Sequence, residues 1–262
     1  MTLENALASA SSESKVEASN FRVFGVSSSN AKNRMEVMEI NSIIGLDGVK
    51  GVMFDCYKTL VDISTDESSV RTYEPLSRWL SYHGVKLYPE GLMREYKRLC
   101  KEAIVGRWER HSEIKVEDIF ARICRDRATW PINDITVGIE AARIFRASSI
   151  RKLQAFPQSI RLLETLRGYP LGVVSNGQRV FSENELKHLG LYGYFKFVLF
   201  SSDFGYKKPD HRIFLAGAQR LGLRPEEILY VGDSQGNDLI PSRQLGMKSM
   251  HVEDAWRFFR VA

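Results

Sequence analysis

The chain of 262 residues has few cysteines, no long apolar run and no concentrated basic patch. Its three cysteines, Cys56, Cys100 and Cys124, are widely spaced, which argues against a disulfide framework or a zinc site and indicates a reducing compartment. No run reaches the roughly 18 apolar residues of a membrane span. The net charge of +5 favours anionic ligands, but no stripe of basic and aromatic residues indicates nucleic acid. We expect a cytoplasmic globular protein with neither a nucleic-acid nor a membrane partner; the sequence does not indicate its oligomeric state.

Residues 1–45 differ in composition from the rest of the chain. The stretches LASASSESKVEAS and VSSSNAKN are rich in Ser, Ala and Asn and contain few large apolar side chains. Such a segment buries little surface, so it predicts a flexible N-terminal tail. It lacks the basic and apolar regions of a signal peptide. Within it, NFRVFGV is also consistent with a short strand that docks on the body of the protein.

Strand and helix patterns alternate in two parts of the chain, 46–64 and 156–262. VKGVMF is typical of a buried strand, and after residue 156 four further strand patterns alternate with helical ones: LGVVS, FKFVLFSS, ILYVGDS and KSMHV. This rhythm predicts an α/β fold, a doubly wound, Rossmann-like core with a parallel sheet. Ligands of such sheets bind beyond the carboxyl ends of the strands.

Residues 65–155 lack strand patterns and contain four amphipathic helical ones. These are EPLSRWLSYHG, with Pro75 near its start and Gly84 past its end, PEGLMREYKRLCKEAI, KVEDIFARICRD and ITVGIEAARIFRA. They predict a small helical bundle inserted after the first strand, where it forms a cap over the same sheet edge. Its segment GRWERH, residues 106–111, is either a surface loop or an element that reaches the site.

Carboxylates follow two of the predicted strands. Asp55 ends the first strand, and Asp233 and Asp238 bracket a strand-to-helix turn in YVGDSQGND. Three carboxylates at one edge of a sheet raise each other's pKa unless a cation neutralises them. Mg²⁺ prefers oxygen ligands and keeps positions open for water and phosphate. The pattern therefore predicts a Mg²⁺ site.

Two other segments suit an anion. Ser175, Asn176 and Gly177 end the second strand in VVSNG, where a hydroxyl and backbone N–H groups at a helix start can bind phosphate. Lys208 in GYKKPD precedes a proline and can offset negative charge on both nucleophile and substrate.

In this order, the four pieces FDCYKTLVD, VVSNG, GYKKPD and YVGDSQGND resemble the motifs of the haloacid dehalogenase (HAD) superfamily over residues 50–252. The resemblance implies a nucleophile at Asp55, with Thr59 binding an oxygen beside it. It implies that Ser175 holds the transferred group. It also implies that Lys208 orients the nucleophile and neutralises negative charge on the nucleophile and the substrate. Asp55, Asp233, Asp238 and the backbone carbonyl of Tyr57 would bind the metal, Asp233 more directly than Asp238.

The chain departs from the family pattern at Tyr57. Phosphatases of the superfamily carry a second Asp at this position, which protonates the leaving alkoxide, whereas 2-haloacid dehalogenases carry Tyr. The dehalogenases need no metal and have Ser in place of Asp233, and their cap arginine has three equally ambiguous counterparts here, Arg71, Arg78 and Arg107. Lys58 also departs from the family pattern, which usually has Gly at this position.

The metal carboxylates favour a phosphatase and Tyr57 favours a dehalogenase. We give the carboxylates more weight, because without a metal the negative charge of Asp233 would repel that of Asp55 at a high cost in free energy. The main hypothesis is a Mg²⁺-dependent phosphohydrolase of a small phosphate ester, acting through an aspartyl-phosphate at Asp55. One alternative is a 2-haloacid dehalogenase-like hydrolase that forms an ester at Asp55. The other is a catalytically weak protein that binds a ligand or a partner.

Overall fold

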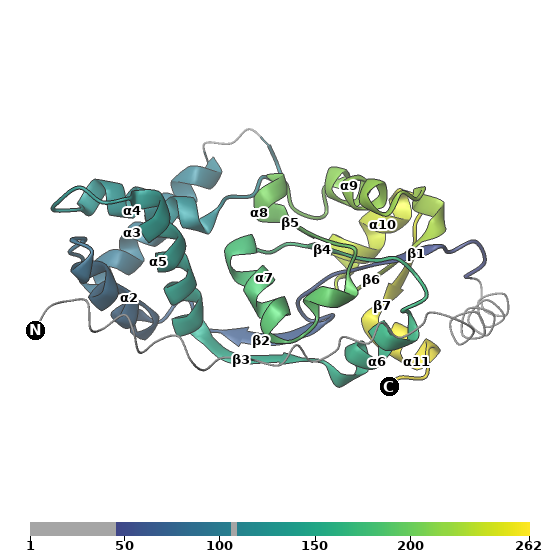
Figure 1. Ribbon diagram of the computed structural model, residues 1–262. Helices are drawn as coiled ribbons and strands as arrows, with labels where there is room; N and C mark the ends of the chain where they lie inside the picture. Colours follow the sequence, from purple (N-terminus) through teal and green to yellow (C-terminus); the bar gives the residue numbers. More distant parts are fainter. Residues whose placement is uncertain (1–45, 106–108) are drawn as a thin grey trace, which may run out of the picture.

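A computed structural model describes residues 46–105 and 109–262 of the chain. The expected tail and the segment NFRVFGV lie outside the described residues. Five parallel strands form one sheet in the order β5–β4–β1–β6–β7 (Figure 1). They are β1 (Gly51–Phe54), β4 (Leu171–Ser175), β5 (Phe197–Phe200), β6 (Ile228–Gly232) and β7 (Lys248–His251). The predicted doubly wound parallel sheet is therefore confirmed.

Helices cover both faces of the sheet, and side chains of β1 alternate between them. Val52 and Phe54 pack in one apolar cluster with α6 (Pro157–Thr165), α7 (Arg179–His188) and α11 (Val252–Phe258). Met53 points to the other face, where α9 (His211–Leu221) covers it. The remaining short helices are α8 (Ser201–Phe204), α10 (Ile240–Gln244) and the single turns η2 (Tyr192–Tyr194), η3 (Pro225–Glu227) and η4 (Gln235–Leu239). Because β1 is buried on both faces, its sequence is continuously apolar.

Four described helices within residues 70–149 form a second layer beside the sheet. They are α2 (Val70–Tyr82), α3 (Pro89–Val105), α4 (Val116–Arg127) and α5 (Asp134–Ser149). Their core is aromatic: the rings of Tyr96 and Phe120 stack at 5.0 Å, and Phe145 lies 5.0 Å from Tyr96. The predicted helical segment is present, whereas its function as a cap and its domain limits stay predictions.

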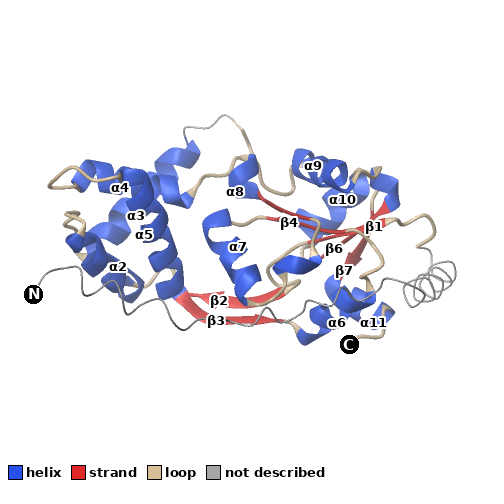
Figure 2. Cartoon of the chain, viewed as in Figure 1, coloured by secondary structure: helices blue, strands red, loops and turns tan. Residues whose placement is uncertain are grey.

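Two details of this segment correct the sequence prediction. The helix around Pro75 begins earlier, at Val70, because the side chain of Ser69 accepts a hydrogen bond from the backbone N–H of Arg71 and caps it; Pro75 lies inside the helix. The segment also contains a strand: β3 (Ile150–Ala155) pairs antiparallel with β2 (Val61–Thr65). Figure 2 shows this ribbon joining the inserted helices to the rest of the chain. Exposed polar residues hide the strand pattern of β3.

Candidate active site

The chain turns sharply directly after β1. The backbone N–H of Asp55 still pairs with Val231 of β6, and the carbonyl of Cys56 then accepts from the N–H groups of Thr59, Leu60 and Val61. This turn brings Thr59 back beside Asp55, with its hydroxyl 3.4 Å from Asp55 Oδ2. Asp55 is therefore fixed at the carboxyl end of the central strand, with Thr59 at its side.

Lys208 holds the candidate nucleophile. Its Nζ lies 2.5 Å from Asp55 Oδ1, 2.7 Å from Asp238 Oδ1 and 3.1 Å from the Tyr230 hydroxyl. Lys208 is 3% exposed, so its three N–H donors are matched by three acceptors in a buried site. Burial acts to lower the Lys208 pKa, but the negative charges of Asp55 and Asp238 outweigh it, so this pKa lies above its usual value.

Burial has the opposite consequence for the carboxyl group of Asp55. It raises the pKa of Asp55 to about 6, against the lowering effect of the Lys208 charge and with a further contribution from Asp238. The carboxylate is thus less well solvated than an ordinary aspartate, which is a condition for a reactive oxygen nucleophile.

Asp55, Asp233 and Asp238 converge as the sequence predicts. One oxygen of each lies within 4.8 Å of the others. Asp238 packs against Gly232, where an added Cβ would lie 2.6 Å from its carboxyl group, and its Oδ2 accepts from the backbone N–H of Ser234 at 3.0 Å. The donors are all oxygens, which fits Mg²⁺. Because Lys208 and Ser234 already engage Asp238, Asp233 fits better as a direct ligand.

The loop after β4 lies next to this cluster. The hydroxyl of Ser175 is buried and has no hydrogen-bond partner among the described residues. A buried hydroxyl without a partner is costly, so this oxygen is available to a ligand. An added Cβ at Gly177 would lie 2.7 Å from the Ser182 hydroxyl and 3.2 Å from that of Ser175, so a side chain at this position would crowd both hydroxyls.

Asn176 has a different geometry from the one expected. Its side-chain amide donates to the carbonyl of Lys208 at 3.0 Å and accepts from the N–H of Lys208 at 2.7 Å. These bonds fix the loop that carries Lys208, so the Asn176 side chain is committed to the protein in this structure. Direct ligand contact by Asn176 stays a prediction.

Tyr57 joins a buried polar cluster. Its hydroxyl lies 2.6 Å from the Ser182 hydroxyl and donates to Glu185 Oε2 at 2.6 Å, both on α7. Glu185 forms a 2.6 Å ion pair with Arg146 of α5, which also contacts Glu67 at 2.9 Å. Burial, followed by nearby negative groups, raises the pKa of Tyr57 above its usual range. Tyr57 thus connects the strand-end turn to the inserted helices.

Arg146 is the arginine that the inserted helices direct to this cluster. Its guanidinium carbon lies 5.7 Å from the centre of the Tyr57 ring. Arg71 and Arg78, considered from the sequence, are exposed on α2, and Arg107 lies outside the described residues. The sequence did not single out Arg146, because nothing in the helical pattern of α5 distinguishes it from its neighbour Arg143.

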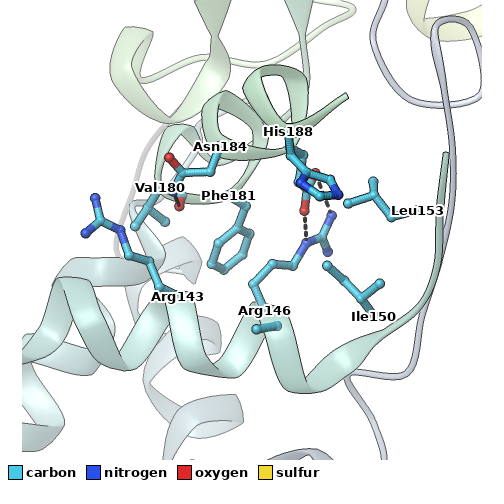
Figure 3. A pocket seen from close by; sticks show the side chains of 10 residues that line it. Arg143, Arg146, Ile150, Leu153, Val180, Phe181, Asn184 and His188 are labelled. Atoms are coloured by element: carbon cyan, nitrogen blue, oxygen red, sulfur yellow. Dashed lines mark hydrogen bonds and ion pairs between the residues drawn. The ribbon is translucent and has the colours of Figure 1, made fainter. Parts of the chain in front are cut away.

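A cavity of about 190 Å³ lies where α5, β3 and α7 meet. Figure 3 shows Arg146 pointing from α5 toward α7, with dashed lines marking its hydrogen bonds, while Arg143 and His188 lie at the margins. The lining of the cavity is mainly apolar and also includes Glu185. The lining contains none of Asp55, Ser175, Lys208 or Asp233, so this cavity is separate from the strand-end cluster.

The segment before α4 also contacts the core loops. His111 accepts a hydrogen bond at its carbonyl from the N–H of Lys207, and Ser112 forms a β-bridge with Tyr206. Gln178, after β4, donates to the Ile114 carbonyl and accepts from the Val116 N–H. Part of the segment 106–111 therefore reaches the loop that carries Lys208; residues 106–108 lie outside the described part.

The structure adds side chains that the sequence reasoning missed: Tyr230, Ser182, Glu185, Arg146 and Gln178. Tyr230 had a usable signal, since it is the one polar side chain within the apolar strand ILYVG. The other four lie on helices or loops whose contact with the strand ends depends on tertiary packing.

Comparison with known proteins identifies the family. The model of "Haloacid dehalogenase-like hydrolase" matches residues 52–252. A glyceraldehyde 3-phosphate phosphatase of Methanocaldococcus jannaschii is 26% identical over 206 residues, covering 78% of this chain and 85% of the relative. A phosphoserine phosphatase of Thermus thermophilus is 30% identical over 187 residues, covering 66% and 75%.

A solved structure agrees with these matches in fold. A 2-haloacid dehalogenase of Pseudomonas syringae pv. Tomato superposes with a TM-score of 0.55 at 25% identity, covering 77% of this chain and 85% of that one. The parallel sheet, the four motifs at its strand ends and the family match over most of the chain lead to one conclusion. This protein belongs to the haloacid dehalogenase-like hydrolases.

Proposed function

We propose that this hydrolase is a Mg²⁺-dependent phosphohydrolase of a small phosphorylated metabolite. The observation that carries the proposal is the convergence of Asp55, Asp233 and Asp238, with one oxygen of each within 4.8 Å of the others, while one buried lysine pairs with Asp55 and Asp238. The single Lys208 ammonium leaves part of this negative charge uncompensated, so the site favours a divalent cation. Relatives named as phosphatases support the same reading.

Asp55 acts as the nucleophile in this proposal. Its oxygen attacks phosphorus, the bond to the leaving oxygen breaks, and an aspartyl-phosphate forms. Lys208 orients Asp55 and offsets negative charge, while the free Ser175 hydroxyl donates to a phosphoryl oxygen. Asp55, the Tyr57 carbonyl, Asp233 and Asp238 would hold Mg²⁺, which would supply positive charge to stabilise the phosphoryl oxygens. Water then releases phosphate and regenerates Asp55.

The helices α2–α5 serve as a cap in the same proposal, with domain limits at 65–155 for the cap and 46–64 plus 156–262 for the core. Support comes from contacts on two sides: Arg146 with Glu185, and the segment at Ser112 with the loop at Tyr206. Breaking and remaking these contacts would admit substrate and then exclude water.

A 2-haloacid dehalogenase-like hydrolase is the second candidate. Tyr57, with Arg146 near its ring, favours it, because a halide leaves without a proton. In that reaction Asp55 attacks carbon, the carbon–halogen bond breaks, and water hydrolyses the resulting ester. The carboxylate of Asp233 has no function in such a reaction. For this reason we rank the dehalogenase function second.

A panel of phosphate esters, acetyl phosphate and 2-haloacids, assayed with Mg²⁺ and with EDTA, separates these functions. We expect phosphate release that EDTA abolishes and added Mg²⁺ restores. Halide release that EDTA does not affect would replace the proposal with the dehalogenase reading. No turnover of any compound would favour the third alternative, a catalytically weak ligand- or partner-binding protein.

The matched variants are Asp55→Asn and Asp126→Asn. Asp55→Asn should lose all turnover while keeping the fold, as judged by circular dichroism, because it removes the attacking oxygen. Asp126 is exposed on α4, so its variant should keep the wild-type rate. Turnover retained by Asp55→Asn would contradict the covalent mechanism.

A further inference from the structure

The hydroxyl of Tyr57 has its hydrogen-bonding capacity filled within the protein. A phenol has one proton to donate, and that of Tyr57 is directed to Glu185 Oε2 at 2.6 Å. The oxygen also lies 2.6 Å from Ser182 and 3.4 Å from an Arg146 nitrogen. Glu185 is 5% exposed and ion-paired with Arg146. A charge-assisted bond of this kind is strong, so the proton of Tyr57 is held away from a leaving group.

The ring of Tyr57 also lies beside the loop after β4. Its Cε2 lies 3.5 Å from the position that a Cβ on Gly177 would take, next to the hydroxyl of Ser175. The turn from Asp55 to Thr59 contains no second carboxyl group. Glu185 lies beyond the phenol oxygen and is bonded to both Tyr57 and Arg146. In this turn, therefore, neither the phenol of Tyr57 nor a second carboxyl group supplies a proton to a departing oxygen, and the side chain of Lys58 is exposed.

We propose that the site acts on phosphoryl compounds whose leaving group departs as a stable anion, with acyl phosphates as the substrate class. This inference rests on the phosphohydrolase function proposed above. An alkoxide, whose conjugate acid has a pKa of about 16 like water, needs a proton as it leaves. A carboxylate, with a conjugate acid near pKa 4, needs none. The penalty of the missing acid therefore grows with the pKa of the leaving group's conjugate acid and is largest for alkyl phosphates.

The two steps balance without an acid in the first. Asp55 Oδ attacks phosphorus, the bond between phosphorus and the acyl oxygen breaks, and the carboxylate leaves with the electron pair. Water then attacks the aspartyl-phosphate, the bond between phosphorus and Asp55 oxygen breaks, and inorganic phosphate leaves. The proton of the attacking water passes to the phosphate product or to solvent. No oxidant, reductant or further reactant takes part.

Leaving-group dependence tests the proposal on the full chain with Mg²⁺. The probes are aryl phosphates of graded phenol acidity, acetyl phosphate, and the alkyl esters phosphoglycolate and glyceraldehyde 3-phosphate. We expect kcat/KM to fall steeply as the leaving-group pKa rises, with acetyl phosphate preferred over both alkyl esters by about 10²–10⁴-fold, the usual effect of a general acid. A flat series, or alkyl esters as good as acetyl phosphate, would overturn it.

Variants of Tyr57 test whether this residue causes the dependence of kcat/KM on the leaving-group pKa, which is called the slope below. Tyr57→Asp should flatten the dependence by restoring a carboxyl group, whereas Tyr57→Phe should keep the wild-type slope, whatever its absolute rate. A steeper slope in Tyr57→Phe would overturn the proposal, because the phenol would then be the acid. Tyr82→Phe, at a tyrosine 88% exposed on α2, is the matched control. If Tyr57→Asp does not fold, the wild-type and Tyr57→Phe slopes still decide.

Failure of the proposed function gives a separate result. In that case none of the compounds, acetyl phosphate included, releases phosphate faster with wild-type protein than with Asp55→Asn. If phosphate is released at a measurable rate but kcat/KM does not depend on the leaving-group pKa, only the proposed substrate class is wrong. The phosphohydrolase function then still holds.

Discussion

Lys58 lies in the turn after Asp55 and has a backbone φ of 61°. A side chain in this left-handed region is crowded against the backbone, at a cost of roughly 1–2 kcal/mol, which glycine avoids. The resemblance places a glycine here, and the structure supplies the physical reason for that preference. The Lys58 side chain is exposed, and among the described residues it is Thr59 and Lys208, not Lys58, whose side chains bond to Asp55.

At this residue, Lys58→Gly should raise the free energy of unfolding by up to about 1 kcal/mol, since relief of the left-handed backbone exceeds the entropy that glycine loses on folding. Lys58→Ala is the matched control: it removes the same side chain, keeps the backbone cost and should change stability little. Urea unfolding of the three proteins measures the difference. Equal stability of the Gly and Ala variants would show that the turn stores no such cost.

At the scale of elements, the ion pair between Arg146 and Glu185 joins α5 to α7. The Arg146 side chain is 11% exposed and that of Glu185 is 6% exposed. The guanidinium also lies 5.2 Å from the centre of the Phe181 ring. A buried pair contributes little relative to an apolar replacement, but removal of one partner leaves a buried charge uncompensated.

We therefore expect Arg146→Ala to destabilise the protein by about 3–5 kcal/mol, measured by thermal or urea unfolding. Arg143→Ala removes the arginine three residues earlier, whose pair with Glu140 is largely exposed, and should cost less than about 1 kcal/mol. The double variant Arg146→Met with Glu185→Leu should recover much of the loss. A cost for Arg146→Ala no larger than for Arg143→Ala would mean that this pair does not hold the two elements together.

At the scale of the whole molecule, the candidate metal site draws on segments far apart in the sequence. Asp55 follows β1, whereas Asp233 and Asp238 follow β6, and only the folded sheet brings them together. A cation that binds this arrangement binds the native state in preference to the unfolded chain. Among the described residues, no helix is both long and apolar enough to cross a bilayer.

Mg²⁺ should accordingly raise the melting temperature, with a stabilisation near 2.7 kcal/mol at a concentration one hundred times its Kd. EDTA should reverse the shift. Asp233→Asn should abolish it, whereas Asp254→Asn, an exposed position on α11, should retain it. Differential scanning calorimetry measures the melting temperature without any substrate. A Mg²⁺-induced rise in melting temperature that persists in Asp233→Asn would show that Asp233 is not a metal ligand, whatever the turnover of the variant.

The sequence by itself determined the five strands of the parallel sheet, the inserted helical segment and the residues at the strand ends, but not the ribbon of β2 and β3. Local rules suffice for these features: β1 is continuously apolar because both faces are covered, and Asp55 must then lie at the sheet edge. The amphipathic faces of α3 and α4 likewise predict their buried residues. The strands β2 and β3 escaped prediction because, among the described residues, they pair only with each other, and the exposed residues of β3 weaken its alternation.

The tertiary structure alone decided what Tyr57 does. From the sequence, Tyr57 was only a departure from the family pattern two residues after Asp55. In the fold, Ser182 and Glu185 of α7 engage its hydroxyl, and Arg146 of α5 pairs with that glutamate. These residues are separated by up to 128 positions in the chain. No local pattern encodes such a contact, because it arises where two helices pack against one strand-end turn.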